Sequence, residues 1–356
     1  MMVCVIGQED YLERLKSYFT VLYPRQKITY ISFPLLTEKP DKTPFNWKYL
    51  TKELVNIPRE MIIYVAFSIK FHFALKEILQ KNGFKNIIFY DSSLDNQLKK
   101  LYFKHIFTTK GEKFILLDEL PNTHEQDGSI MQVYLAECVR DRSINMYPEK
   151  LPAEIIPIQV GAALTNVRIA EVTDNTGDNI SNRNPHYSEM TAFYWIWKNA
   201  KADYLGICHY RRLWVDLEKI GNKLRVSDID AVLPLPTLCK YSVYNDYFLR
   251  HIPDVWQSMM DVLKKQSPEY YKAANKIFKG NIFYASNMCI LKHQVFNNLC
   301  EWMFPIVMEI EEYIGDLSDP YYNRYAGFCT ERLITLYFLY NKQCWNIAHA
   351  EKIFIG

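Results

Sequence analysis

The residues with the most chemical potential in this sequence are a cationic group that follows an apolar run. Residues 204–208 read as a buried strand, and His209-Tyr210-Arg211-Arg212 comes directly after it. In an open α/β sheet, ligands bind outside the carboxyl ends of the strands, so these side chains stand where a ligand is expected. The planar fork of Arg can hold two phosphate oxygens, and a neighbouring His can add a hydrogen bond or a proton. The pattern favours an anion site, with a structural ion pair as the alternative.

The spacing within this group predicts which side chains act together. If the strand stays extended beyond its apolar part, successive side chains project to opposite faces. His209 and Arg211 then share one face, and Tyr210 and Arg212 share the other. We therefore expect His209 and Arg211 to bind one anionic group jointly.

Carboxylates elsewhere in the chain could supply acid–base or metal chemistry. Asp228-Ile229-Asp230 has the spacing that often holds a divalent metal on a diphosphate. It precedes the strand expected at 231–235, however, which puts it at the amino end of the sheet and argues against a metal site. Glu331 lies early in a predicted helix and is a better candidate, although the helix dipole alone favours an acidic residue there.

Other reaction classes lack a matching motif. The sequence contains no GxSxG elbow, no HExxH and no Gly-rich phosphate loop of the GxGxxG or GxxxxGK type. Its eight Cys show neither a CxxC pair nor zinc-like spacing, which favours free thiols in a reducing compartment. With 42 basic and 40 acidic residues, the net charge of +2 suggests no nucleic-acid partner.

The length of 356 residues predicts two α/β domains that would position these groups. Residues 1–125 alternate β-branched runs with amphipathic segments, which predicts a small Rossmann-like domain with a parallel sheet and an unclear role. Its expected strands are at 2–6, 28–33, 61–67, 86–90 and 113–117, with helices near 9–21, 47–54, 71–82 and up to about 107. The start of the chain reads as a buried strand and not as a secretion signal, and no run is long enough to span a membrane.

A polar break at 121–128 predicts the boundary, and the second domain is expected at 129–356. Strands are predicted at 131–136, 155–161 and 204–208, and a polar loop at 173–181. Asn184-Pro185 should start one helix, with Asn184 as its cap. The core face of that helix should carry Met190, Phe193, Tyr194 and Trp197. A loop that turns at Asn287 should enter a strand and then a helix at 295–311.

Several blocks in this second domain occur together in one known family. They are PIQVGA at 157–162, DNTGDNIS at 174–181, YSEMTAFYWIWKN at 187–199, GICHYRR at 206–212, Asn287-Met288, and GFCTERL at 327–333. In this order they resemble the bacterial capsular and exopolysaccharide glycosyltransferases catalogued as domain of unknown function 4422, over about residues 130–356. Where members of that family usually carry Thr-His-Lys, this chain has Glu137-Cys138-Val139, which indicates altered donor recognition or an inactive scaffold.

The resemblance implies a GT-A-like fold and a nucleotide-sugar donor, most simply a UDP-sugar of galactose or galactofuranose. It implies a glycan or lipid-linked acceptor in capsule or O-antigen synthesis, in the cytoplasm, with at most peripheral contact with the inner face of the cell membrane. A divalent metal, Mn²⁺ or Mg²⁺, stays open as a cofactor. The alternative is a non-catalytic carbohydrate-binding or assembly-scaffold protein that keeps the transferase fold.

The expected site residues follow from the same resemblance. Glu331 and Asp178 are the candidate catalytic carboxylates, and His209, Arg211 and Arg212 the expected diphosphate ligands. The expected contacts to the donor or acceptor sugar are Asp174, Asn179, Glu189, Tyr210 and Asn287.

Overall fold

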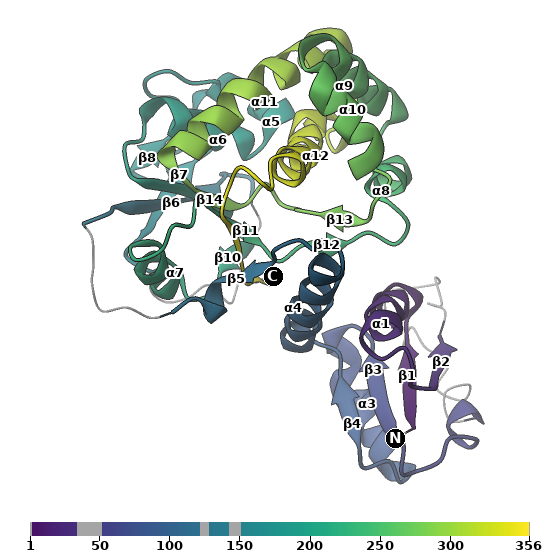
Figure 1. The fold of residues 1–356 in the computed structure, drawn as a ribbon. Helices are drawn as coiled ribbons and strands as arrows, with labels where there is room; N and C mark the ends of the chain where they lie inside the picture. The colour runs from purple at the N-terminus through teal and green to yellow at the C-terminus, as the bar shows by residue number, and fades with distance from the viewer. Residues whose placement is uncertain (1, 34–51, 122–127, 142–150, 356) are drawn as a thin grey trace. The chain divides into compact units, whose positions relative to one another are not determined.

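The computed structural model describes residues 2–33, 52–121, 128–141 and 151–355. The chain divides into two compact units, Met1–Lys113 and Phe114–Gly356 (Figure 1). The polar break predicted at 121–128 and the helix predicted near 47–54 lie largely outside the described residues.

The first unit is built on a four-stranded parallel sheet in the order β2-β1-β3-β4. Its elements are β1 (Val3–Gly7), α1 (Glu9–Leu22), β2 (Ile28–Ser32), β3 (Ile62–Ala66), α3 (His72–Lys81), β4 (Ile87–Phe89) and α4 (Ser92–Thr109). Leu75 and Leu79 of α3 share a core cluster with Ile63, whereas Phe19 of α1 packs edge-on against Tyr64. Neighbouring strand residues thus face different helices, and the parallel α/β prediction for this unit is confirmed.

The second unit contains a ten-stranded mixed sheet. Its main row is β5 (Ile115–Leu116), β15 (Ile347–Ala350), β11 (Ala231–Pro234), β14 (Cys289–Lys292), β9 (Tyr204–His209), β6 (Met131–Glu137), β7 (Ile155–Gln159) and β8 (Val172–Thr173). Neighbours in this row are parallel except at β14, which runs against both β11 and β9. The start of β14 therefore lies beside the end of β9, because Cys289 is paired with Ile207.

The strand predicted at 113–117 forms as β5, but it does not join the first sheet. It pairs with β15 at the edge of the large sheet. Leu117, directly after β5, is 3% exposed in a core cluster of the second unit, and Ile115 packs against the same cluster. Burial of these apolar side chains explains why the segment belongs to the second unit.

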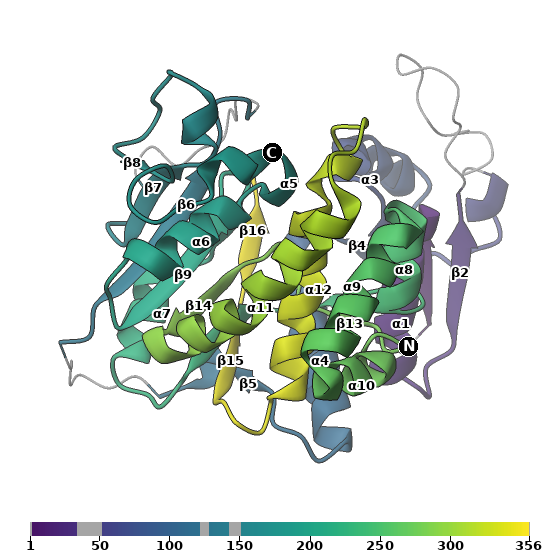
Figure 2. The same cartoon turned by 90° about the horizontal axis from the view of Figure 1, so that it is seen from above.

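Helices cover both faces of the large sheet, as Figures 1 and 2 show. They are α5 (Asn184–Tyr187), α6 (Met190–Asn199), α7 (Leu217–Leu224), α8 (Val243–Arg250), α9 (Pro253–Gln266), α10 (Pro268–Ile277), α11 (His293–Ile314) and α12 (Tyr325–Tyr340). Along β9, Leu205 and Ile207 enter the larger core beneath α6, α11 and α12, whereas Tyr204 and Cys208 enter the smaller core with α7. By this alternation, His209 belongs to the side of the larger core.

The single helix predicted from Asn184 onward is divided in two. Ser188 adopts a φ of 52°, a conformation that an α-helix cannot include, and separates α5 from α6. Asn184 does not cap the start of α5; instead its side-chain amide donates to the carbonyl of Ser188 at 2.8 Å. The break leaves Glu189 immediately before the first residue of α6.

The eight cysteines are free thiols, as predicted, and six of them are buried. Burial raises the pKa of the Cys208 thiol, so it stays protonated and unreactive. Among the described residues, no helix combines the length and the apolar character that crossing a membrane requires.

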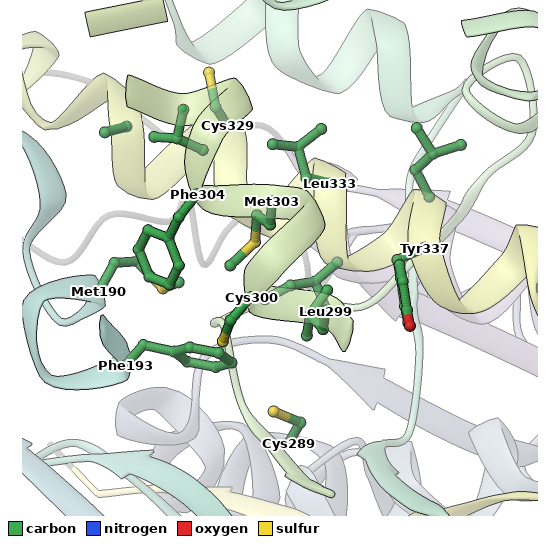
Figure 3. Packing of buried hydrophobic residues seen from close by; sticks show 14 of the residues in the cluster. Met190, Phe193, Cys289, Leu299, Cys300, Met303, Phe304, Cys329, Leu333 and Tyr337 are labelled. Carbon is green, nitrogen blue, oxygen red and sulfur yellow. The ribbon is translucent and has the colours of Figure 1, made fainter. Parts of the chain in front are cut away.

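The larger core holds α6 against α11 through aromatic contacts (Figure 3). Phe193 of α6 is fully buried and stacks on Phe296 of α11, with ring centroids 4.5 Å apart. Phe193 also lies 6.5 Å from Phe304, centroid to centroid. This packing fixes the position of α6, and hence of Glu189 at its amino end.

We predict that Phe193→Ala lowers the free energy of unfolding by about 3–5 kcal/mol, because it removes a buried ring and leaves a cavity. Urea-induced unfolding measures the loss. Leu249→Ala, at a position that is 73% exposed, is the matched control and should change stability by less than about 0.5 kcal/mol. Equal effects of the two substitutions would contradict the assigned core.

Candidate functional site

The chain turns sharply at the carboxyl end of β9. Tyr210 and Arg211 form a turn, and Arg212 pairs with His209 as the antiparallel strand β10 (Arg212–Trp214) begins. The extended arrangement expected from the sequence is therefore not formed, and His209 and Arg211 do not share a strand face. The reason lies in β10, which pairs with β16 (Lys352–Phe354) and buries Leu213 in the smaller core.

His209 is the end of β9 and is only 7% exposed. Burial lowers the pKa of its imidazole; Glu189 opposes this effect, whereas Arg212 and Lys352 add to it. The backbone of Ser286, beside the ring, acts to raise the pKa. Its Nε2 atom is buried and has no hydrogen-bond partner among the described residues.

The turn before β14 brings a second polar group to this place. Ser286 and Asn287 have φ values of 84° and 48°, both in the left-handed region that residues other than Gly seldom adopt. Asn287 is 1% exposed, and its amide nitrogen donates to Glu189 Oε1 at 2.9 Å and to the Gly327 carbonyl at 3.1 Å. Its Oδ1 is buried with no partner within the described structure. Such strain is frequent at ligand-binding sites.

Glu189 connects these two groups. Burial acts to raise the pKa of its carboxyl, but the His209 ring and the Asn287 amide outweigh that effect, and the pKa lies below its ordinary value. The carboxylate is therefore ionised at neutral pH. It stands at the amino end of α6 because the chain breaks at Ser188.

Glu331 lies in the second turn of α12, so the dipole of the helix start does not explain it. Its Oε1 accepts from the Ser286 amide at 2.6 Å, and its Oε2 accepts from Arg332 at 2.9 Å. Burial raises the pKa of this carboxyl, although Arg332 and the Ser286 amide oppose the shift. With both oxygens engaged, Glu331 holds the strained turn in place.

Four cations surround this cluster. Arg211 lies 5.0 Å from the ring of Tyr210, and Arg212 lies 5.6 Å from the ring of Phe354. Lys352 donates to the Ala285 carbonyl at 2.9 Å and to the Ser286 hydroxyl at 3.0 Å, and Arg324 donates to the Ser188 hydroxyl at 2.8 Å. The Nε of Arg211 is buried without a partner among the described residues, so this group still has a donor to offer.

Asp141, Arg324 and Lys352 were not identified from the sequence. Asp141 accepts from the Cys138 amide at 2.6 Å, and its burial raises the pKa of its carboxyl, against the effects of that amide and of Arg211. Its place four residues after β6, at the carboxyl edge of the sheet, is a signal that could have found it. Lys352 lies in β16, and no local pattern connects it to β9.

The structure does not bring Asp178 into this cluster. Its carboxylate accepts from the Tyr194 hydroxyl at 3.2 Å, and its backbone carbonyl accepts from Asn199 at 2.9 Å. Asn199 ends α6, so it lies roughly 15 Å from Glu189 at a helical rise of 1.5 Å per residue. Asn179 bonds within the same loop, to Gly177. The two candidate catalytic carboxylates, Asp178 and Glu331, therefore lie in separate groups of contacts.

Asp174 has a structural role. It is fully buried, and its carboxylate accepts from the Gly161 amide at 2.8 Å and the Ala162 amide at 3.0 Å. The hydroxyl of Ser181 also donates to it. These contacts engage both oxygens of a fully buried carboxylate and join two loops.

The Asp228–Asp230 pair precedes β11, as the sequence predicted. Asp230 forms an ion pair with Lys292 at 2.9 Å and accepts from the Asn346 amide at 2.9 Å. Within the part of the chain that the structure describes, no group of three or more His, Cys, Asp or Glu side chains is arranged to hold a metal ion.

Comparison with known proteins identifies two similarities. The model of a protein family described as "Domain of unknown function (DUF4422)" matches residues 144–342. Among solved structures, the chain is similar to the apo structure of WbbM, a bifunctional glycosyltransferase, with 26% sequence identity and a TM-score of 0.55. The similarity covers 64% of this chain and 45% of that one, so it spans less than half of WbbM. No curated protein matches the chain.

The buried Arg332 generates a prediction about stability. It is 1% exposed and pairs with Glu331 at 2.9 Å and with Asp246 at 3.2 Å. Arg332→Met removes the paired cation of Glu331 and the buried one of the two cations at Asp246, and should lower the free energy of unfolding by about 3–5 kcal/mol.

Arg250→Met is the matched control, because Arg250 pairs with the same Asp246 from a side chain that is 66% exposed. This exposed pair should contribute less than about 1 kcal/mol. Urea-induced unfolding compares the variants, and similar losses in both would contradict the role given to Arg332.

Proposed function

Because the chain belongs to the family described as a domain of unknown function (DUF4422), and because a solved structure similar to it is a glycosyltransferase, we propose that this protein transfers sugars. The donor is a nucleotide-diphosphate sugar, and the acceptor is a polysaccharide or a lipid-linked oligosaccharide. The second unit carries the activity on a GT-A-like fold.

The observation that carries this proposal is the arrangement around the end of β9. An ionised carboxylate, Glu189, lies with His209 and Asn287 at one edge of the sheet, and the cations Arg211 and Arg212 follow in the adjoining turn. Cations are needed where a diphosphate departs, and a carboxylate where a proton is accepted or a sugar is oriented. Both requirements are met by residues at the carboxyl edge, where ligands of α/β sheets bind.

In the transfer step, the acceptor hydroxyl oxygen forms a bond to the anomeric carbon of the sugar. The bond between that carbon and the diphosphate oxygen breaks, and the proton of the acceptor hydroxyl passes to the Glu189 carboxylate. Arg211 and Arg212 stabilise the negative charge that develops on the leaving diphosphate. The diphosphate of the intact donor already carries negative charge and gains more as the bond breaks, so these cations bind the donor and stabilise the transition state more strongly.

The contacts favour Glu189 over Glu331 as the carboxylate that acts on the substrate. Both oxygens of Glu331 are bound by the protein, and its pKa is raised. Glu189 accepts one side-chain hydrogen bond, from Asn287, and its pKa is lowered. Glu331 then acts as a positioning residue for the turn that carries Asn287.

The resemblance to the capsular glycosyltransferases indicates which nucleotide-sugar donors to test first. They are UDP-galactose and UDP-galactofuranose, with capsular or O-antigen saccharides as acceptors. No ligand set for a metal is found among the described residues, so we assign no step to one. A reaction with and without EDTA tests that point directly.

The proposal predicts that the full chain releases nucleoside diphosphate from at least one nucleotide sugar when an acceptor saccharide is present. Arg211→Ala should lower turnover about 100-fold or more, because it removes a cation from the developing charge. Arg225→Ala removes the same charge at α7, where the guanidinium bonds to Asn222 and Ser129, and should leave turnover within about twofold of the unmodified protein.

Near-normal turnover in Arg211→Ala would contradict the assigned diphosphate site. If no nucleotide sugar yields diphosphate and no nucleotide raises the melting temperature, the proposed activity fails. Binding of glycans by such an inactive protein would instead support a carbohydrate-binding scaffold.

A further inference from the structure

Two buried polar atoms beside Glu189 have no partner among the described residues. They are Nε2 of His209, in a side chain that is 7% exposed, and Oδ1 of Asn287, in one that is 1% exposed. Burying a polar atom without a partner is costly, and native proteins leave few such atoms. Both atoms belong to residues that contact or face Glu189, so they form one group.

The chemistry of His209 decides what this group can receive. Burial lowers the pKa of its imidazole below the ordinary value of about 6.5, so the ring is neutral at neutral pH. A neutral imidazole carries one N–H and one lone pair. The unpaired Nε2 can therefore form a hydrogen bond with a hydroxyl group, which can both donate and accept.

The contacts of Asn287 show that its unpaired atom is the amide oxygen. Its amide nitrogen is committed to Glu189 and to the Gly327 carbonyl, so the flanking contacts fix which end of the amide stays unpaired. The nitrogen has two acceptors as partners, and reversing the amide would face Oδ1 toward both of them. The unpaired atom of Asn287 is therefore an acceptor.

A phosphate oxygen does not suit this place. Phosphate oxygens are acceptors with negative charge, and here they would meet an amide oxygen and the ionised Glu189. A hydroxyl group can donate to both of these and can also pair with His209 Nε2 in either tautomer. A sugar ring carries several hydroxyls on adjacent carbons and can satisfy more than one acceptor at once.

We propose that His209 Nε2 and Asn287 Oδ1 receive hydroxyl groups of a sugar ring, and that the diphosphate lies away from them, at Arg211 and Arg212. This inference rests on the proposed function and deepens it. It moves His209 from the diphosphate, where the sequence placed it, to the sugar. The ring belongs either to the donor or to the acceptor saccharide, which share this chemistry.

The surrounding contacts explain how Asn287 is held in place. It lies in a strained turn directly after Ser286. The amide of Ser286 donates to Glu331, and its hydroxyl accepts from Lys352. Both holders act on the backbone or on Ser286 and leave the Asn287 amide oxygen unpaired. Glu331 and Lys352 are positioning residues for the sugar in this arrangement.

The test compares binding of three probes by calorimetry: UDP, a UDP-sugar that the protein uses, and an acceptor saccharide. His209→Phe keeps an aromatic ring but removes Nε2. Asn287→Gly keeps the positive φ but removes the side-chain amide. Each variant should weaken binding of the sugar-bearing probe about tenfold, the effect of one lost hydrogen bond in a buried site, and should leave UDP within twofold. Arg211→Ala, as the matched comparison, should weaken UDP and UDP-sugar alike.

His209→Gln provides a rescue, because its amide can accept or donate a hydrogen bond in the place of Nε2, and it should recover most of the lost affinity. A loss confined to the UDP-sugar assigns the hydroxyls to the donor, and a loss confined to the saccharide assigns them to the acceptor. Loss of UDP binding equal to that of the UDP-sugar in both variants would overturn the inference. If the unmodified protein binds no nucleotide, the proposed function fails, and the saccharide measurements alone decide the inference.

Discussion

The site depends on one reversed strand. Because β14 runs against β9, its beginning lies beside the end of β9, and a loop that enters β14 meets the residue that ends β9. This pairing sets Ser286 and Asn287 against His209 at the carboxyl edge of the sheet. A parallel strand in the same position would present its carboxyl end there and send the Asn287 turn to the opposite edge. The strain in the turn is tolerated because Glu331 and Lys352 hold it.

The position of Glu189 depends on a second local feature, the break between α5 and α6. Ser188 ends one helix and α6 begins two residues later, so Glu189 faces the end of β9 and not the flank of a longer helix. The aromatic contacts of Phe193 then fix α6 on the sheet. Stability and function are thus linked, since core packing determines where the carboxylate stands.

Much of the fold was predictable, because hydrophobic period and turn residues report on local structure. The described strands and helices of the first unit, and β6, β7, β9, β11 and β14 of the second, were expected near their observed bounds. Periodicity could not show that 113–117 joins the other sheet, since pairing partners are a property of the tertiary structure. The break at Ser188 was missed because the apolar spacing of Met190, Phe193 and Trp197 fits one uninterrupted helix equally well.

His209 was predictable because it follows a buried strand, and Glu189 and Asn287 were named through the family resemblance. Their mutual contacts, and the separation of Asp178 from them, arise from long-range pairing that local sequence does not report. A crystal structure of the chain with an unreacted nucleotide sugar and acceptor would test most directly where the sugar and the diphosphate bind. We predict a sugar hydroxyl within hydrogen-bonding distance of His209 Nε2 and of Asn287 Oδ1, with the diphosphate at Arg211. A diphosphate bound at His209 and Asn287, or a ligand at a different edge of the sheet, would contradict it.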